Sequence, residues 1–484
     1  MGFYRRRHPE RSDYYRLLES GFEAFARNWP EDFESRYGFL RKEVQGAVFA
    51  FLECGIPENG VARVRCPGCG HDFFVAFSCR TRVVCPSCTT RRSLLFGEKV
   101  REIVHPLNHR HLTFTIPKLL RAYLRRNRRL GKLLLRSAWQ AWQEYLRKRM
   151  QIRAGMSGGI FCLQTHGSLF NFHPHVHALV LPGLVRQGRF HELKGCSATA
   201  VAVSFRSRFL NALQKQEVLD GDMVERLMSW DHNSGFNVHA GKPINGSDGE
   251  AIERQARYMS RAPLSVERIH YHADDHSVTV DGGKSHAGTK NWTVPEFFAL
   301  LAAHTPCRYE SLVTYYGVYS SSHRGKCKRE NREERVEEIV VEAVPVSSAA
   351  RQPSNWAKWI RKICETDPLT CSECGEPMRI IAFITDSHEV AKILEHIGEQ
   401  TSRAPPLTPT DPVPSSCDFD DTNFQYAEVP WYPDPPRWTF EGGTEYCALR
   451  GPFCRFREGS TAVESFFTAG FDGGSPPNPH LLIY

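Results

Sequence analysis

The chain has 484 residues, of which 41% are hydrophobic, and its formal net charge is +8. A chain of this length normally forms more than one core, so we expect several domains. It contains no run of eighteen apolar residues and its first residues lack an apolar signal core, which predicts a cytoplasmic, nucleoid-associated bacterial protein with no membrane span. In that compartment the sixteen cysteines are expected as metal ligands or free thiols rather than disulfides.

Composition divides the chain into seven regions. In chain order, we expect an N-terminal helical segment (1–45), a Cys-rich region (46–95), a basic helical region (96–155), a domain of short apolar runs and Gly-rich turns (156–326), a linker (327–353), a small C-terminal module (354–397) and a Pro-rich acidic tail (398–484). The tail holds 13 of the 30 prolines and is expected to be largely disordered. Since residues 401–484 carry 5 Arg, no Lys and 11 Asp or Glu, the first 400 residues carry +14, which favours an anionic partner such as DNA.

Two Cys-Pro-x-Cys motifs, fifteen residues apart, lie in the Cys-rich region. Their cysteines are Cys66, Cys69, Cys85 and Cys88. Each motif turns tightly enough to direct two sulfurs at one ion, and the spacing is typical of a zinc ribbon. We therefore expect these four thiolates to bind one structural Zn²⁺, which leaves no open position for water.

Other cysteines have less definite roles. Cys54, His71 and Cys79 could complete a second site, although a lone cysteine is more often a small buried hydrophobe. In the C-terminal module, "CSECG" offers only Cys371 and Cys374. We interpret these two as vestigial thiols in preference to a half-site shared between chains.

The densest basic stretch is "KLLRAYLRRNRRLGKLLLRSAWQAWQEYLRKRM" together with Arg153, with 12 Lys or Arg and one acidic residue, Glu144. Its apolar residues recur at helical spacing, which predicts helix around Gly131. A solvated basic helix and a surface that faces DNA phosphates both fit this pattern, and the charge density favours the second. The candidate DNA-binding residues here are Arg125, Arg126, Arg128 and Arg129.

A strand-like run, "HPHVHALVLPG", places His175 and His177 on one face, since they are two residues apart. The preceding run, "IFCLQTHG", resembles the partner strand of a hairpin, so Gln164 or His166 could reach the same ion and His173 could do so from the turn. Hydrogen-bonded core histidines are the alternative. Imidazoles with an amide suit a divalent ion with open positions, which can polarise a phosphoryl oxygen.

The segment "SDGEAIERQARYMSRAP" predicts a short helix, with Ser247 and Glu250 as its capping box. Tyr258 lies off the apolar stripe of this helix, and a tyrosine beside a metal site is a candidate attacker of phosphate. Candidate DNA-binding residues flank it: Arg254, Arg257 and Arg261. Three other tyrosines compete on sequence grounds: Tyr271, Tyr315 and Tyr316.

Four motifs together, "QTHGSLFNFHPHVHALVLPG", "WDHNSGFNVHAGKPI", "ARYMSRAPLSVERI" and "YYGVYSSSHRGK", resemble the rolling-circle transposases of the IS91 family, in the HUH (His-hydrophobe-His) endonuclease superfamily. The N-terminal cysteines, with "FLECG" and "AFSC", resemble the zinc-binding domain of that family. The resemblance runs from about Phe51 to Lys326 and continues more weakly toward the C-terminal module.

The resemblance implies an α+β fold: an antiparallel palm flanked by helices, with a zinc-ribbon module before it and a small module and tail after it. It implies that His175 and His177 bind Mg²⁺ or Mn²⁺ and that Tyr258 attacks single-stranded DNA at element ends to form a 5′-phosphotyrosine. Arg254 stands where two-tyrosine members carry a second tyrosine, so the chain resembles the single-tyrosine branch, and a homo-oligomer could supply a second nucleophile. Some relatives of the superfamily carry a metal ligand one turn after the tyrosine, but that position, 262, is Ala here. We therefore expect Gln164 as the third ligand, with His166 as the second choice.

Two other functions fit part of this pattern. A plasmid replication initiator or relaxase would use the same chemistry, although the N-terminal zinc ribbon argues against it. A non-enzymatic zinc DNA-binding regulator would make the histidines structural.

Overall fold

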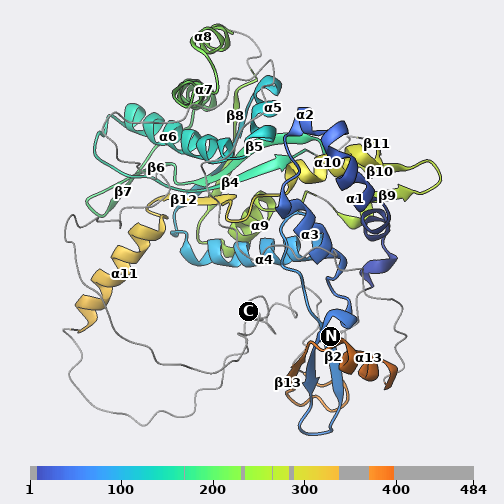
Figure 1. Ribbon diagram of the computed structural model, residues 1–484. Coiled ribbons are helices and arrows are strands. Elements are labelled where there is room, and N and C mark those ends of the chain that lie inside the picture. The colour runs from blue at the N-terminus through green and yellow to red at the C-terminus, as the bar shows by residue number, and fades with distance from the viewer. Residues whose placement is uncertain are drawn as a thin grey trace, which may run out of the picture.

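The computed structural model describes residues 8–167, 169–230, 235–263, 265–282, 288–336 and 370–396. Helices and antiparallel sheets both contribute to it, which confirms the predicted α+β class (Figure 1). The predicted tail and much of the predicted linker lie outside the described residues. Among the residues described, no helix combines the length and apolar character that crossing a bilayer requires.

A five-stranded antiparallel sheet, the palm, lies at the centre of the molecule. Its strands, in spatial order, are β12 (Val313–Gly317), β4 (Gly158–His166), β5 (Phe172–Val180), β3 (Asn108–Thr115) and β8 (Asn237–Asn245). Every residue of β4 is buried, as are the last seven of β5, because helices cover both faces of the palm. Such two-sided burial agrees with apolar residues on both faces of β5, where Val176 and Val180 lie on one face and Leu179 on the other.

The two faces of the palm carry different helices (Figure 1). One face packs on α5 (Lys118–Arg126), α6 (Leu130–Met150) and α7 (Ala198–Lys215), with α8 (Gly221–Ser229) and the hairpin β6 (Gly183–Arg186) and β7 (Arg189–Glu192) beside them. Val176, Ala178 and Val180 belong to the core on this face. The opposite face packs on α4 (Pro86–Ile103) and α9 (Gly249–Met259), and Leu179 belongs to that core. Since side chains alternate along a strand, His175 and His177 point with Leu179 toward α9.

The basic stretch forms two helices rather than one continuous helix. Helix α5 ends at Arg126, and α6 begins at Leu130. Gly131 lies at this break, where an added Cβ would come within 2.6 Å of the Leu163 side chain. The glycine therefore allows α6 to begin in close contact with β4.

Helices from the N-terminal segment form a second core with a helix and three strands from residues 269–304. These are α1 (Asp13–Asp32), α2 (Glu34–Tyr37) and α3 (Lys42–Leu52), which pack with α10 (Val294–His304) and the sheet β11 (Thr289–Thr293), β10 (Ser277–Asp281) and β9 (Ile269–His272). Three aromatic side chains of α1, Phe22, Phe25 and Trp29, are buried in this core, and the ring centroids of Phe25 and Phe298 lie 5.3 Å apart. Aromatic contacts thus hold the N-terminal helices against α10.

Three buried or half-buried arginines converge on the C-terminal end of α10. Arg41 donates to the carbonyls of Ala302 and Thr305, and Arg128 donates to that of Ala303. Arg82, from the Cys-rich loop, donates to the carbonyls of Cys307 and Glu310. Cations are stabilising at this end of a helix because its last carbonyls carry partial negative charge.

The third sheet combines segments from both ends of the described chain (Figure 1). Its middle strand is β1 (Val61–Arg65), with β2 (Asp72–Ala76) on one side and β13 (Arg379–Ile384) on the other. Helix α13 (Ser387–His396) packs beside it, and α11 (Ser321–Val336) lies apart from it. The segment predicted as a separate C-terminal module thus shares a sheet with the predicted zinc-binding domain.

Candidate active site and metal centres

Helix α9 carries the predicted nucleophile to the palm. Its N-cap is Asp248, whose side chain accepts from the amide of Ala251 at 3.0 Å, so the predicted capping box of Ser247 and Glu250 is wrong. Ser and Asp are both good N-cap residues. Because the helix begins at Gly249, the residue that caps it is Asp248 rather than Ser247. The apolar stripe of α9 is buried on the palm, and Tyr258, in its last turn, keeps 45% of its surface exposed.

The histidine pair lies directly beside this tyrosine. The Nε2 atoms of His175 and His177 are 3.0 Å apart. The ring centroids of His177 and Tyr258 are 5.3 Å apart, at an interplanar angle of 68°. Two segments about eighty residues apart in sequence therefore meet at one site.

The hydrogen bonds of the two imidazoles favour a metal site. His175 Nδ1 lies 2.7 Å from the carbonyl oxygen of His173 and must donate to it, so His175 Nε2 keeps its lone pair. His177 Nδ1 lies 3.0 Å from Nε2 of His111, on β3. Burial, with the charge of His175 next, lowers the pKa of His177 to about 2, so this ring is neutral near pH 7, as a metal ligand must be.

His111 is a site residue that the sequence reasoning missed. It contacts His177, and its ring centroid is 6.0 Å from that of Tyr258. Its signal was the alternation of His109 and His111 in "NHRHLTFT", which has the same spacing as the histidine pair.

Gln164 connects the palm to helix α9. It pairs with His175 across the strands, and its Nε2 donates to the carbonyls of Tyr258 at 3.0 Å and Met259 at 2.8 Å. Its Oε1 is buried without a hydrogen-bond partner in the described structure. A buried amide oxygen that lacks a partner fits a metal ligand.

His166, the second choice for third ligand, lies past a register irregularity in β4. Its Nε2 also lacks a partner among the described residues, and its ring faces His304 with centroids 6.3 Å apart. Burial first, then the charge of His304, lowers its pKa well below the ordinary value. His166 is therefore neutral as well, although it points toward His304.

Positive charge surrounds the tyrosine. The guanidinium of Arg261 lies 5.0 Å from the centre of the Tyr258 ring. Burial lowers the pKa of His175, and the positive charges of Arg261 and Arg121 lower it further. Arg254 and Arg257 are exposed on α9. Arg261 thus places one positive charge beside Tyr258, and Arg254 and Arg257 add exposed positive charge to the same helix.

The basic turn between α5 and α6 contributes less to such a surface than predicted. The prediction of DNA binding is wrong for Arg128, whose side chain is 7% exposed and pairs with Glu310 at 2.8 Å. The prediction fails because the turn that carries Arg128 packs against the C-terminal end of α10. Arg125 and Arg126 donate to backbone carbonyls of the α2 region, whereas Arg129 is exposed.

The competing tyrosines have other surroundings. Tyr315 lies between the cations of Lys99 and Arg324, each within 5.6 Å of its ring centre, and burial raises its pKa to about 12. Tyr316 stacks on Trp139 with centroids 5.2 Å apart. The amide of Tyr271 donates to Asp13. Of the four candidate tyrosines, Tyr258 is therefore the one that lies beside the histidine pair.

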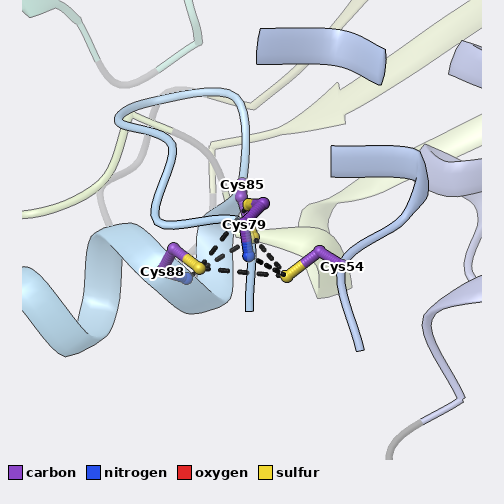
Figure 2. A group of neighbouring side chains, drawn as sticks. All are labelled: Cys54, Cys79, Cys85 and Cys88. Carbon is purple, nitrogen blue, oxygen red and sulfur yellow. Dashed lines mark hydrogen bonds between the residues drawn. The ribbon is translucent and has the colours of Figure 1, made fainter. Parts of the chain in front are cut away.

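The Cys-x-x-Cys motifs do not form the predicted single zinc site. Cys85 and Cys88 group with Cys54 and Cys79, all four sulfurs lying within 4.8 Å of one another (Figure 2). The sulfurs of Cys54 and Cys88 are 3.8 Å apart. A tetrahedral ion with Zn–S bonds of about 2.3 Å requires sulfurs about 3.8 Å apart, so this cluster fits Zn²⁺.

The other motif groups with distant cysteines. Cys66 and Cys69 meet Cys371 and Cys374, again with all four sulfurs within 4.8 Å. The interpretation of Cys371 and Cys374 as vestigial is therefore wrong. The interpretation failed because spacing along the chain favours Cys85 and Cys88 as partners of Cys66 and Cys69. The pairing of β1 with β13 instead brings Cys371 and Cys374 next to them.

Helix α4 links the first cysteine cluster to helix α9. Cys85 caps the N-terminus of α4, and Cys88 lies in its first turn. Further along α4, the hydroxyl of Ser93 donates to the carbonyl of Arg257 at 3.0 Å. Gly97 then faces α9 so closely that a Cβ would come within 2.9 Å of side-chain atoms there. One rigid helix thus spans from the thiolates to the turn that carries Tyr258.

Comparisons with known proteins agree with this arrangement. A family model described as "Transposase zinc-binding domain" matches residues 24–116, and one described as "Putative transposase" matches residues 158–327, together more than half of the chain. The chain is also 24% identical to the transposase for insertion sequence element IS801 of Pseudomonas savastanoi pv. phaseolicola over 366 residues, which cover 72% of this chain and 86% of that relative. No solved structure matches the chain significantly.

Fold, cysteine clusters and family matches together define an insertion-sequence transposase with an N-terminal zinc-binding domain. The chain belongs to the IS91 family, which confirms the resemblance that its motifs indicated.

Proposed function

We propose that this transposase cleaves and rejoins single-stranded DNA at the ends of its element through a covalent bond to Tyr258. The observation that carries the proposal is the contact of Tyr258 with His177, together with a Gln164 oxygen that has no hydrogen-bond partner among the described residues. Transfer from a tyrosine ester conserves the energy of the broken phosphodiester for rejoining. The step fits the rolling-circle mode of transposition.

His175, His177 and Gln164 would hold a divalent ion. Two neighbouring ligands of an octahedral ion with bonds of about 2.1 Å lie about 3 Å apart, which agrees with the 3.0 Å between the imidazole nitrogens. Mg²⁺ or Mn²⁺, when bound, would supply Lewis-acid polarisation of the scissile phosphate. We propose Gln164 over His166 because Gln164 lies opposite His175 in the strand register.

Residues of this chain would provide the nucleophile, bind the phosphate and position the nucleophile. The Tyr258 hydroxyl loses its proton, to water in this half-exposed position, and its oxygen forms a bond to phosphorus. The bond from phosphorus to the 3′-oxygen breaks, that oxygen takes a proton, and the 5′-phosphate stays on the tyrosine. Arg261 and Arg121 would hold the phosphate charge, and Gln164 would fix the turn that carries the nucleophile.

In rejoining, a 3′-hydroxyl would attack phosphorus and the Tyr258 oxygen would leave and take a proton, so cleavage of the second element end needs a tyrosine nucleophile again. Arg254 stands four residues before Tyr258, so the site offers one tyrosine. Either Tyr258 acts twice or a second protomer supplies its own tyrosine.

The test uses single-stranded oligonucleotides of the element ends, labelled at either terminus, with Mn²⁺. We expect the 3′-labelled fragment to enter a denaturant-stable adduct, while the 5′-labelled fragment is released with a 3′-hydroxyl. Tyr258→Phe removes only the hydroxyl, so it should fold and bind DNA but form no adduct. Tyr309→Phe, which alters a tyrosine that is 90% exposed, is the matched control and should react normally.

His177→Ala gives an independent test of the metal pair. We expect it to bind DNA nearly as well as the wild type, because affinity comes mainly from the basic surface, but to form no adduct. DNA binding without cleavage in the wild-type protein would instead support a zinc-binding regulator. An adduct mapped to Tyr315 or Tyr316 would show that Tyr258 is the wrong nucleophile.

A further inference from the structure

We propose that Cys66, Cys69, Cys371 and Cys374 bind a second structural Zn²⁺ ion, which fastens the C-terminal strand to the N-terminal zinc-binding domain. Cys371 and Cys374 lie outside both segments that the family models match. The proposal concerns metal binding alone and does not depend on the chemistry of Tyr258.

The sulfur geometry suits a tetrahedral ion. The sulfurs of Cys66 and Cys374 are 3.4 Å apart, and those of Cys69 and Cys371 are 3.5 Å apart. These distances are close to the spacing of about 3.8 Å in a four-thiolate zinc site, and far longer than a disulfide bond of about 2.05 Å. Four thiolates also match the closed ligand set of structural zinc.

Both halves of the site have the same backbone conformation. In the first half, the amide of Gly70 donates to the carbonyl of Cys66 at 3.0 Å, and the amide of Cys66 donates to the carbonyl of His71 at 2.8 Å. Gly70 has a φ of +78°, which glycine adopts without strain.

The second half repeats each of these features. The amide of Gly375 donates to the carbonyl of Cys371 at 3.0 Å, and the amide of Cys371 donates to the carbonyl of Glu376 at 2.9 Å. Gly375 has a φ of +77°. Two matching Cys-x-x-Cys-Gly turns that face each other form the two halves of a zinc ribbon, with strands β1, β2 and β13 leading into and out of them.

The apolar core next to the four cysteines is small. It contains five buried residues, two of which are the ligands Cys66 and Cys371. Such a small core rarely stabilises a module by itself, and a structural metal commonly supplies the missing free energy. The ion would therefore join segments 308 residues apart in sequence.

Metal analysis of the full chain tests the proposal. We expect two Zn²⁺ per wild-type chain and one in the double variant Cys371→Ser, Cys374→Ser. Cys196→Ser, which alters a half-buried cysteine outside both clusters, is the control and should retain two. One Zn²⁺ in the wild type, with no loss in the double variant, would overturn the proposal.

A second variant decides the question if the double variant does not fold. Cys374 is exposed, so Cys374→His should be tolerated and should keep a nitrogen ligand. With Co²⁺ in place of Zn²⁺, we expect the thiolate charge-transfer absorption to fall by about one eighth, since one of eight thiolates is lost. An unchanged spectrum would show that Cys374 is not a ligand.

Discussion

Gly97 lies where α4 crosses the nucleophile helix α9, and replacing it by alanine tests whether this contact positions Tyr258. An added Cβ would lie 2.9 Å from the Cγ atoms of Arg257 and Glu253 and 3.2 Å from the carbonyl oxygen of Glu253. The two side chains can rotate away, but the carbonyl oxygen belongs to the helix backbone. Helix α9 must therefore move by a few tenths of an ångström.

Two opposing effects set the expected loss of stability. Alanine favours the helix by about 1 kcal/mol over glycine, whereas overpacking costs about 1–3 kcal/mol. We expect Gly97→Ala to lower the free energy of unfolding by about 1 kcal/mol. Since a displacement of 1 Å near reacting atoms can cost about a hundredfold in rate, a shift of a few tenths of an ångström at Tyr258 should slow adduct formation about three- to tenfold.

Urea unfolding and the rate of adduct formation measure the two effects. Gly46→Ala is the matched control, because Gly46 lies in helix α3 with nothing within 4 Å of the position that an added Cβ would occupy. This control should gain about 0.5–1 kcal/mol and react at the wild-type rate. If Gly97→Ala gains as much stability as the control and reacts as fast, α4 does not position the nucleophile helix.

Three further predictions concern single side chains. Arg128→Met should lower the free energy of unfolding by about 3 kcal/mol in urea titrations, because it removes the ion pair with the largely buried Glu310, which keeps a hydrogen bond from the Cys307 amide; a loss below about 1 kcal/mol would contradict this. Burial lowers the pKa of His304 to about 3, so the unfolded state binds more protons below about pH 6.5 and stability should fall as the pH drops from there toward 3. From pH 7 to 5, the wild type should lose about 2 kcal/mol more than His304→Gln, and equal losses would refute the assignment. Gln164→Leu should weaken Mn²⁺ binding and adduct formation, whereas Gln164→Glu, which keeps an oxygen, should retain Mn²⁺ binding in calorimetry; equal binding by both would exclude Gln164 as a ligand.

Local patterns in the sequence predicted the parts of this molecule that depend on neighbouring residues. Strand alternation placed His175 and His177 on one face, and helical spacing placed Tyr258 off the apolar stripe of α9. The position of the tyrosine beside the histidines came from the family resemblance, because no local pattern states how a helix crosses a sheet.

Long-range pairing could not be predicted in the same way. The fifteen residues between the two Cys-Pro-x-Cys motifs fit one zinc ribbon as well as the observed division into two clusters does. The choice between them depends on whether β1 pairs with β13, a contact across most of the chain. Similarly, the charge of Arg128 indicated that its side chain contacts solvent or DNA phosphates. Only the tertiary structure shows that its partner is Glu310.

The sheet that joins β1 to β13 has a consequence for synthesis of the protein on the ribosome. Strand β1 leaves the ribosome early, but β13, which pairs with it, is synthesised more than 300 residues later. At about 5–20 residues per second, the nascent chain exposes one edge of β1 for about 15–60 s. During that interval the edge is open to pairing with other chains, as unpaired strand edges generally are. Premature termination anywhere before Arg379 makes this exposure permanent, so truncated copies of the protein should aggregate even when their palm is complete.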